Sequence, residues 1–548
     1  MAFKLICWIL ILSSSISSSS STSSNQNWIP PSQSALALQD AINVAISSGK
    51  NSYTIINGGK FLFNSASLNI TSSLSSFILY GEGAELIFAV GSASIIIRDS
   101  INLTIYNLTI DSSTPTFTQG IITLISDSCF STETPPLICV IDITVDDGFP
   151  NPTIWCSKCE TKLIFFNPQT KLMIRPQIPT WLINATSLNN GSSYRLFTQQ
   201  LWEHSIVVGD VVIVASRACG PCTYQVINSS FITTRNVSIH SSCNMAFYEL
   251  GGGGGNIYDN IHVTTRQDDI RYLASNFDAF HSEGTMIGPS VTNSYFSHIG
   301  DDFFNVQNAI DIVLGFLDNV NRTIVVADSS FGSTYPISSH TFFKFFLPQQ
   351  GNAWLANEIY NATICNSTKL QGDEATSWIL LAENASTVFF EKYGWTFANF
   401  APLSYDIWTL TICEESSTPN PDLLTYTTLA QVNSSFGAKF TNNYFEDNLV
   451  RGGVLVSPNS TFKGNTINGT QFGGLLLSAE ITWLSGNLGN SNVAIIDNIF
   501  IDCCPYTRID YPYGICNNTI TPLYPVFNPG GVGGRSSGII IENNTILD

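Results

Sequence analysis

Three aspartates near the middle of the chain have the residue types and the spacing of an acid/base site. Asp278 lies in the stretch NFDAFH, and the pair Asp301-Asp302 follows in IGDDFFNVQN. The offset of 23 residues between Asp278 and Asp301 is about one coil of a parallel β-helix, where stacking makes such positions neighbours. Neighbouring carboxylates shift one another's pKa, as acid/base chemistry requires. We therefore predict that Asp278, Asp301 and Asp302 are catalytic.

The reaction that such carboxylates suit is the hydrolysis of a glycosidic bond. One carboxyl group protonates the leaving oxygen, and in inverting enzymes a second group, about 6.5–9.5 Å away, activates water. Adjacent residues on a strand face opposite sides, so Asp301 and Asp302 reach one site only at a bend, which Gly300 supplies. A structural ladder of Asn and Asp side chains is the alternative, because β-solenoid turns are rich in these residues.

Short β-branched runs punctuated by Asn and Gly predict the coils that position these aspartates. The sequence indicates an all-β chain built as a right-handed parallel β-helix, the pectin-lyase-like solenoid. Apolar residues at helical spacing between Ser34 and Gly49 predict an amphipathic helix that caps its open end. Two stretches that read as hairpins predict two small antiparallel β-modules inserted between coils.

These patterns divide the chain into six parts. The predicted parts are a signal peptide and Ser-rich segment (1–24), the capping helix and first coils (25–139), an inserted β-module (140–214), coils with the candidate site (215–312), a second inserted β-module (313–432), and the last coils (433–548).

The N-terminus and the composition favour export through the secretory pathway. Lys4 precedes a short apolar run and a serine tract, the order of a secretory signal, so we expect a secreted or lysosomal-type protein. The chain has 16 N-x-S/T sequons and 13 cysteines, which suits a glycosylated, disulfide-bonded protein, although the pairing stays open. The glycosylation candidates that we single out are Asn69, Asn102, Asn107, Asn228, Asn236, Asn361, Asn366 and Asn468.

The net charge of −19 restricts the partners that the chain can bind. Nucleic acids and anionic polysaccharides attract basic grooves, so a neutral oligosaccharide or glycoconjugate is the expected substrate. No segment after the signal is long enough to span a bilayer, and we expect no cofactor and no metal. The oligomeric state stays open.

The residues around the aspartates resemble a known enzyme family. The stretch GDVVIV…NVSIHSSCNMAFYE…NFDAFH…VTNSYFSHIGDDFFNVQN is similar to the core of the right-handed parallel β-helix α-1,3-galactosidases, glycoside hydrolase family 110. The resemblance implies metal-independent, inverting removal of terminal α-galactose by Asp278, Asp301 and Asp302. The side chains that we expect to contact the sugar are those of Asn276, His281, Asn305, Gln307, Arg451 and Trp483.

Departures from that family pattern leave the sugar and its linkage open. Ala279 stands where glycine is usual, Gln307 replaces a frequent histidine, and Phe303-Phe304 follow the aspartate pair, where they are expected to alter the pocket. A non-catalytic β-helix that binds glycans, or acts in adhesion or wall structure, is therefore a second hypothesis. Polygalacturonase-like pectin hydrolases also place one aspartate a coil before an Asp-Asp pair, but their Gly-His-Gly step and basic triplet are missing here.

Overall fold

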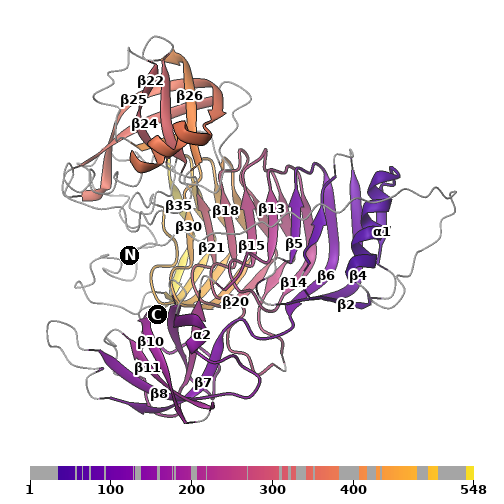
Figure 1. Ribbon diagram of the computed structural model, residues 1–548, viewed down its shortest axis with the longest axis vertical. Coiled ribbons are helices and arrows are strands. Elements are labelled where there is room, and N and C mark those ends of the chain that lie inside the picture. The colour runs from indigo at the N-terminus through magenta and orange to yellow at the C-terminus, as the bar shows by residue number, and fades with distance from the viewer. Residues whose placement is uncertain are drawn as a thin grey trace.

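A computed structural model describes residues 35–547 with internal gaps, the longest of which are 329–340, 382–405, 416–427, 478–490 and 504–537. The predicted signal segment lies outside the described residues. In the described part of the chain, no helix is long and apolar enough to cross a membrane. The chain is mostly β, and its main body is a stack of coils whose strands pair in parallel (Figure 1).

Two parallel sheets form the walls of the coils. The smaller described sheet has seven strands: β3 (Leu68–Ile70), β5 (Ile95–Arg98), β13 (Tyr224–Ile227), β15 (Phe247–Leu250), β18 (Phe280–Glu283), β21 (Phe304–Gln307) and β30 (Gly453–Leu455). The larger one has seventeen: β1 (Ser52–Thr54), β2 (Lys60–Phe63), β4 (Phe77–Phe88), β6 (Leu103–Ser112), β14 (Thr233–Ile239), β16 (Ile257–Asp259), β17 (His262–Val263), β19 (Ser290–Thr292), β20 (Tyr295–Ile299), β28 (Lys439–Thr441), β29 (Tyr444–Asn448), β31 (Thr461–Lys463), β32 (Thr466–Thr470), β33 (Ala494–Ile496), β34 (Ile499–Cys503), β35 (Ile540–Glu542) and β36 (Thr545–Leu547). This parallel stacking confirms a β-helix, while its right-handed sense stays a prediction.

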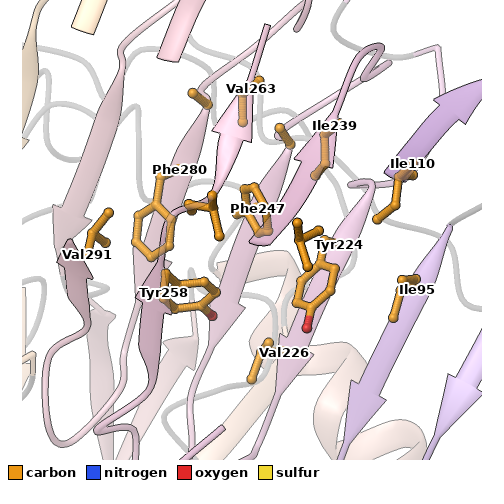
Figure 2. Packing of buried hydrophobic residues seen from close by; sticks show 14 of the residues in the cluster. Ile95, Ile110, Tyr224, Val226, Ile239, Phe247, Tyr258, Val263, Phe280 and Val291 are labelled. Atoms are coloured by element: carbon orange, nitrogen blue, oxygen red, sulfur yellow. The ribbon is translucent and has the colours of Figure 1, made fainter. Parts of the chain in front are cut away.

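Alternating apolar residues fill the space between the sheets. In β5, for example, Ile95 and Ile97 are fully buried while the residues between and after them are only partly buried. Rings from successive coils meet in this core, and Tyr258 packs edge-on against Phe247 and Phe280 (Figure 2). The recurring asparagines form a column of their own, because the side chain of each accepts hydrogen bonds from the previous one, in the order Asn443, Asn465, Asn498 and Asn544.

The helix α1 (Ala35–Ser47) lies at the end of the stack that the first coils form (Figure 1). It buries Leu38, Ile42 and Ala45 against the first coils. Gly49 has a φ of +70° and donates its N–H to the Ile46 carbonyl, which is how glycine ends a helix. The helix thus covers apolar interior that the next coil would otherwise cover.

Two closed six-stranded barrels interrupt the coils and project from opposite sides of the stack (Figure 1). We call them barrel 1 and barrel 2. Barrel 1 contains β7 (Thr118–Ile125), β8 (Cys139–Val145), β9 (Thr161–Phe166), β10 (Thr180–Asn189), β11 (Ser193–Thr198) and β12 (Val211–Ser216), with the short helix α2 (Thr153–Cys156). Barrel 2 contains β22 (Asp311–Asp318), β23 (Thr323–Asp328), β24 (Thr341–Gln349), β25 (Asn352–Lys369), β26 (Asp406–Glu415) and β27 (Thr428–Gln431).

Barrel 1 begins earlier than the sequence suggested. We expected its boundary at residue 140, but β7 already pairs antiparallel with β8 and β12 from Thr118 onward. A strand of a closed barrel and a strand of a coil have the same apolar alternation, so the sequence alone does not separate them.

The sequence predicted disulfides without their pairing, and the structure has them in barrel 1, in barrel 2 and in the coils. Cys129–Cys139 closes a connection in barrel 1, Cys365–Cys413 joins β25 to β26, and Cys219–Cys243 links neighbouring coils. Among the glycosylation candidates, Asn361 has no described side chain, Asn468 is half-buried, and the others are exposed.

Candidate active site

The candidate site lies where the chain turns from the larger sheet into the smaller one. We call this set of turns the site corner; in successive coils it comprises residues 240–246, 264–279, 300–303 and 449–452. Barrel 1 occupies the same corner one coil earlier, because it is inserted between β6 and β13. Barrel 2 instead follows β21 and precedes β28, so it leaves the coil on the opposite side of the smaller sheet.

The pairing register fixes which residues form a column in this corner. Phe280 pairs with Phe304, and Phe304 pairs with Gly453. Two residues before these positions stand Asp278, Asp302 and Arg451, so one coil is 24 residues here. Our count of 23 aligned Asp278 with Asp301; the register instead stacks Asp302 on it, and the Asp302 N–H lies 3.3 Å from Oδ1 of Asp278.

The three carboxylates converge. One oxygen from each of Asp278, Asp301 and Asp302 lies within 4.8 Å of the others, and all three residues are buried, with at most 4% of their surface exposed. Gly300 makes the bend possible, since a Cβ there would lie 2.7 Å from the Asn276 carbonyl oxygen. Buried carboxylates this close repel one another unless cations or protons compensate them.

Two cations and a histidine provide that compensation. Nζ of Lys162 lies 2.8 Å from Oδ2 of Asp301, and this ion pair is almost fully buried. Arg451 donates three hydrogen bonds to the carboxylate of Asp302. Nη2 lies 2.7 Å from Oδ2, and Nε and the backbone N–H each lie 3.0 Å from Oδ1. Nδ1 of His281 donates to Oδ2 of Asp278 at 2.7 Å.

Lys162 is the site residue that our sequence reasoning missed. It sits on β9 of barrel 1, between the rings of Trp181 and Phe277, with its Nζ about 5.9 and 5.8 Å from their centres. The available signal was a single lysine directly before the apolar run LIFF, because lysine is almost never fully buried without a partner. That run lies in the segment 140–214, for which the sequence predicts only an antiparallel β-module.

His281 titrates under the control of its neighbours. Burial lowers the pKa of His281, but the hydrogen bond and the charge of Asp278, helped by Glu283 and Asp302, outweigh burial and raise it above 6.5. Its Nε2 faces the Gln307 amide at 3.5 Å, while Gln307 Oε1 has no hydrogen-bond partner among the described residues. Turning the amide over would let protonated His281 donate to Oε1, which suits the raised pKa.

Asn305 and Gln307 extend the site along the outer face of β21. Asn305 pairs with His281 in the register, so the two side chains are neighbours on that face. Oδ1 of Asn305 and Oε1 of Gln307 are buried acceptors that no described group satisfies. Such groups cost free energy unless a ligand, water or movement satisfies them.

The other sequence candidates fall in different places. Asn276 is buried, and its amide donates to the carbonyls of Thr116 and Ser216, so it fastens the two ends of barrel 1 to the coil. Phe303 and Phe304 do not alter the pocket as expected, because the register places both rings in the core, against Phe445 and Phe440. Trp483 lies outside the described residues.

The same three carboxylates have the oxygen donors that a hard divalent cation prefers. Lys162 and Arg451 already place positive charge on two of them, however. The arrangement is therefore electrostatically balanced by groups of the chain itself, and a metal ion would have to compete with them.

Comparisons with known proteins give no functional assignment. No protein-family model matches the chain, and no curated protein matches it. Among solved structures, the chain is similar to the A-module of Azotobacter vinelandii mannuronan C-5 epimerase AlgE4, with 10% identity over 86% of this chain and 74% of that one, at a TM-score of 0.25. It is also similar to PfbA, a surface adhesin of Streptococcus pneumoniae, with 8% identity over 86% of this chain and 76% of that one, at a TM-score of 0.28. At these values neither protein bears on what this chain does.

Proposed function

We propose that the protein is a secreted glycoside hydrolase that removes terminal α-linked galactose from a neutral glycan. The observation that carries hydrolysis is the convergence of Asp278, Asp301 and Asp302, with oxygens within 4.8 Å of one another, on a buried corner. The choice of α-galactosides, α-1,3-linked ones first, comes from the sequence resemblance alone.

The contacts suggest how the work is divided. A neighbouring cation favours the ionised form of a carboxylate, so Asp301 beside Lys162 and Asp302 beside Arg451 suit the base that activates water. Asp278 and His281 share a hydrogen bond between a carboxylate and a titratable imidazole, so this pair suits the proton donor to the leaving oxygen.

The spacing bears on the stereochemistry. Inverting enzymes hold their carboxyl groups about 6.5–9.5 Å apart so that water fits between sugar and base. The nearest oxygens here lie within 4.8 Å of one another. Inversion, which the resemblance implies, therefore requires these side chains to separate when sugar and water enter.

The direct test is to incubate the purified protein with α-1,3-linked galactosides and follow the first anomer released by NMR. We expect β-galactose, no effect of EDTA, and loss of turnover in Asp278→Asn, Asp301→Asn and Asp302→Asn. α-Galactose as first product would contradict inversion only. No turnover across a panel of neutral glycosides and polygalacturonate would contradict hydrolysis.

A second candidate is a glycan-binding β-helix without catalysis. The observation that favours it is the tight closure of the site, where each carboxylate is at most 4% exposed and each is already hydrogen-bonded. Binding on a glycan array that survives Asp301→Asn and Asp302→Asn, without hydrolysis by the parent protein, would support this candidate over the enzyme.

A further inference from the structure

An open cleft lies at the other end of the site corner from the aspartates, next to the larger sheet. It consists of two adjoining cavities of about 640 and 460 Å³, both lined by His240, Arg266 and Gln267. Lys171 and Leu172, in the turn after β9 of barrel 1, form part of its opposite wall. Volumes of this size are typical of sites for small organic ligands.

β9 connects this cleft to the candidate active site. Its residue Lys162 contacts Asp301, and its last residue, Phe166, leads into the turn that lines the cleft. At about 3.3 Å per residue, the four steps along β9 from Lys162 to Phe166 span about 13 Å. The lining residues of the cleft do not include the three aspartates, so the cleft is separate from the candidate active site.

The two arginines that line the cleft are paired with neighbouring carboxylates, whereas Nζ of Lys171 donates to the Asp269 backbone carbonyl. Nε of Arg266 lies 2.6 Å from Asp111, and its Nη2 bonds Glu85. Arg271 donates from both terminal nitrogens to Asp111 and from Nε to Asp269. The carboxylates thus hold the two arginines as oriented donors, and the cluster of arginines and carboxylates has little net charge. In a chain of charge −19, such a cluster does not favour an anionic ligand.

The polar groups that remain alternate between donors and acceptors. Nδ1 of His240 donates to the Thr264 carbonyl at 2.8 Å, so Nε2 carries the lone pair when the ring is neutral. Burial, with Arg266 and Arg271 adding to it, lowers the pKa of His240, so the ring is neutral at neutral pH. Within the described part of the chain, Nη1 of Arg266 and the amide of Gln267 make no hydrogen bond, so both can contact a ligand.

We propose that this cleft is a second binding site, for a neutral sugar. A sugar hydroxyl both donates and accepts, so neighbouring hydroxyls can donate to His240 and accept from Arg266 or Gln267. Ile270 and Leu172, which are 60% and 40% exposed, offer apolar surface for the C–H face of the ring. The proposal does not require that the aspartate site hydrolyse anything.

The test is a glycan array with neutral and uronate-containing glycans, probed with the full chain and three variants. Gln267→Trp fills the cleft without removing a hydrogen bond, and Arg266→Met removes the donor. Arg235→Met is the control, because Arg235 is a half-exposed arginine of the larger sheet that does not line the cleft and faces Asp259 at 3.5 Å. Thermal unfolding checks that each variant is folded.

We expect at least one neutral glycan to lose about tenfold or more in affinity with Arg266→Met, as loss of one or two hydrogen bonds implies. The same glycan should lose at least as much with Gln267→Trp, because the larger side chain occupies the space of the sugar, and should keep its affinity with Arg235→Met. If Arg266→Met is unfolded, Gln267→Trp decides. The proposal is overturned if no neutral glycan binds, or if Gln267→Trp binds every neutral glycan as tightly as the parent protein does. It is equally overturned if the dependence is confined to uronate-containing glycans.

Discussion

Barrel 1 and barrel 2 have the same architecture but different relations to the coils. Part of the barrel 1 core is continuous with the site corner, since Ile164, Phe166 and Val211 pack in one cluster with Leu273 and Leu449. The described core of barrel 2 contains residues of its own strands, such as Val313, Ile364 and Leu410. Barrel 1 also donates hydrogen bonds to the coils, from Met173 to Asp447 and from Gln177 to Gln471.

The difference shows that the place of an insertion decides its role. A barrel that leaves the coil at the site corner can add a side chain to the site, and Lys162 does so. Barrel 2 leaves the coil at the other edge of the smaller sheet, and its described core consists of residues from its own strands. We therefore expect changes in barrel 1 to alter stability and activity together, and changes in barrel 2 to alter stability alone.

The largest effect is expected from Lys162→Met. It leaves the buried Asp301 without its cation, so the free energy of unfolding should fall by about 3–5 kcal/mol and turnover should be lost. Chemical denaturation and hydrolysis of an α-galactoside measure the two. Adding Asp301→Asn should recover stability but not turnover, and Lys60→Met, which breaks an exposed ion pair, should cost about 1 kcal/mol or less. Full turnover in Lys162→Met would contradict the prediction that barrel 1 contributes to activity.

Truncations in the two cores compare the barrels directly. Phe166→Ala in barrel 1 should cost about 3–5 kcal/mol and Ile364→Ala in barrel 2 about 2–5 kcal/mol, because each opens a cavity at a fully buried position. Only Phe166→Ala should also reduce turnover, since it loosens the strand that carries Lys162. Hydrogen exchange of each barrel, with turnover measured under conditions where both variants are folded, checks this. Equal loss of turnover in both would remove the distinction.

The coil's own cation should show a smaller change in stability. Arg451→Lys keeps the positive charge but loses the two-pronged contact with Asp302, so we expect a loss of about 1.5–3 kcal/mol and a clear drop in turnover. Denaturation and steady-state kinetics measure both. Unchanged turnover would mean that charge alone, and not the orientation of Asp302, matters.

The smallest effect is expected from pH. The pKa of His281 is raised in the folded protein, so its pairing with Asp278 contributes fully below about pH 6.5 and is lost as pH rises through the higher folded value. His281→Gln should flatten the stability curve in that range. Thermal unfolding from pH 5 to pH 9 shows this, and a parent curve that is already flat above pH 6.5 would contradict it.

The sequence was sufficient for the parts of the fold that repeat. Alternating apolar residues predicted the coils, and the recurring asparagines form a ladder whose members bond one another. It also identified Asp278, Asp301 and Asp302 as neighbours. These inferences succeed because each depends on a local period that one coil repeats in the next.

The sequence was insufficient where contacts cross long stretches of chain. Lys162 lies 139 residues before Asp301, and no period connects them. The alignment of Asp302 with Asp278 differs from our count by one residue, which only the pairing of Phe280 with Phe304 determines. The hydrogen bonds of Asn276 to Thr116 and Ser216 could not be predicted for a similar reason, because these partners depend on where barrel 1 leaves the coil.

The insertion of barrel 1 between β6 and β13 has a consequence for how the chain folds. Val226 pairs with Ile97, and Asn228 bonds Asp99 across 129 residues, so two neighbouring coils meet only after a long stretch has been placed. Closing a loop of that length costs entropy before the contact is made, whereas a closed barrel shortens the effective loop. We expect barrel 1 to fold early, with coil growth pausing at this point until it has done so.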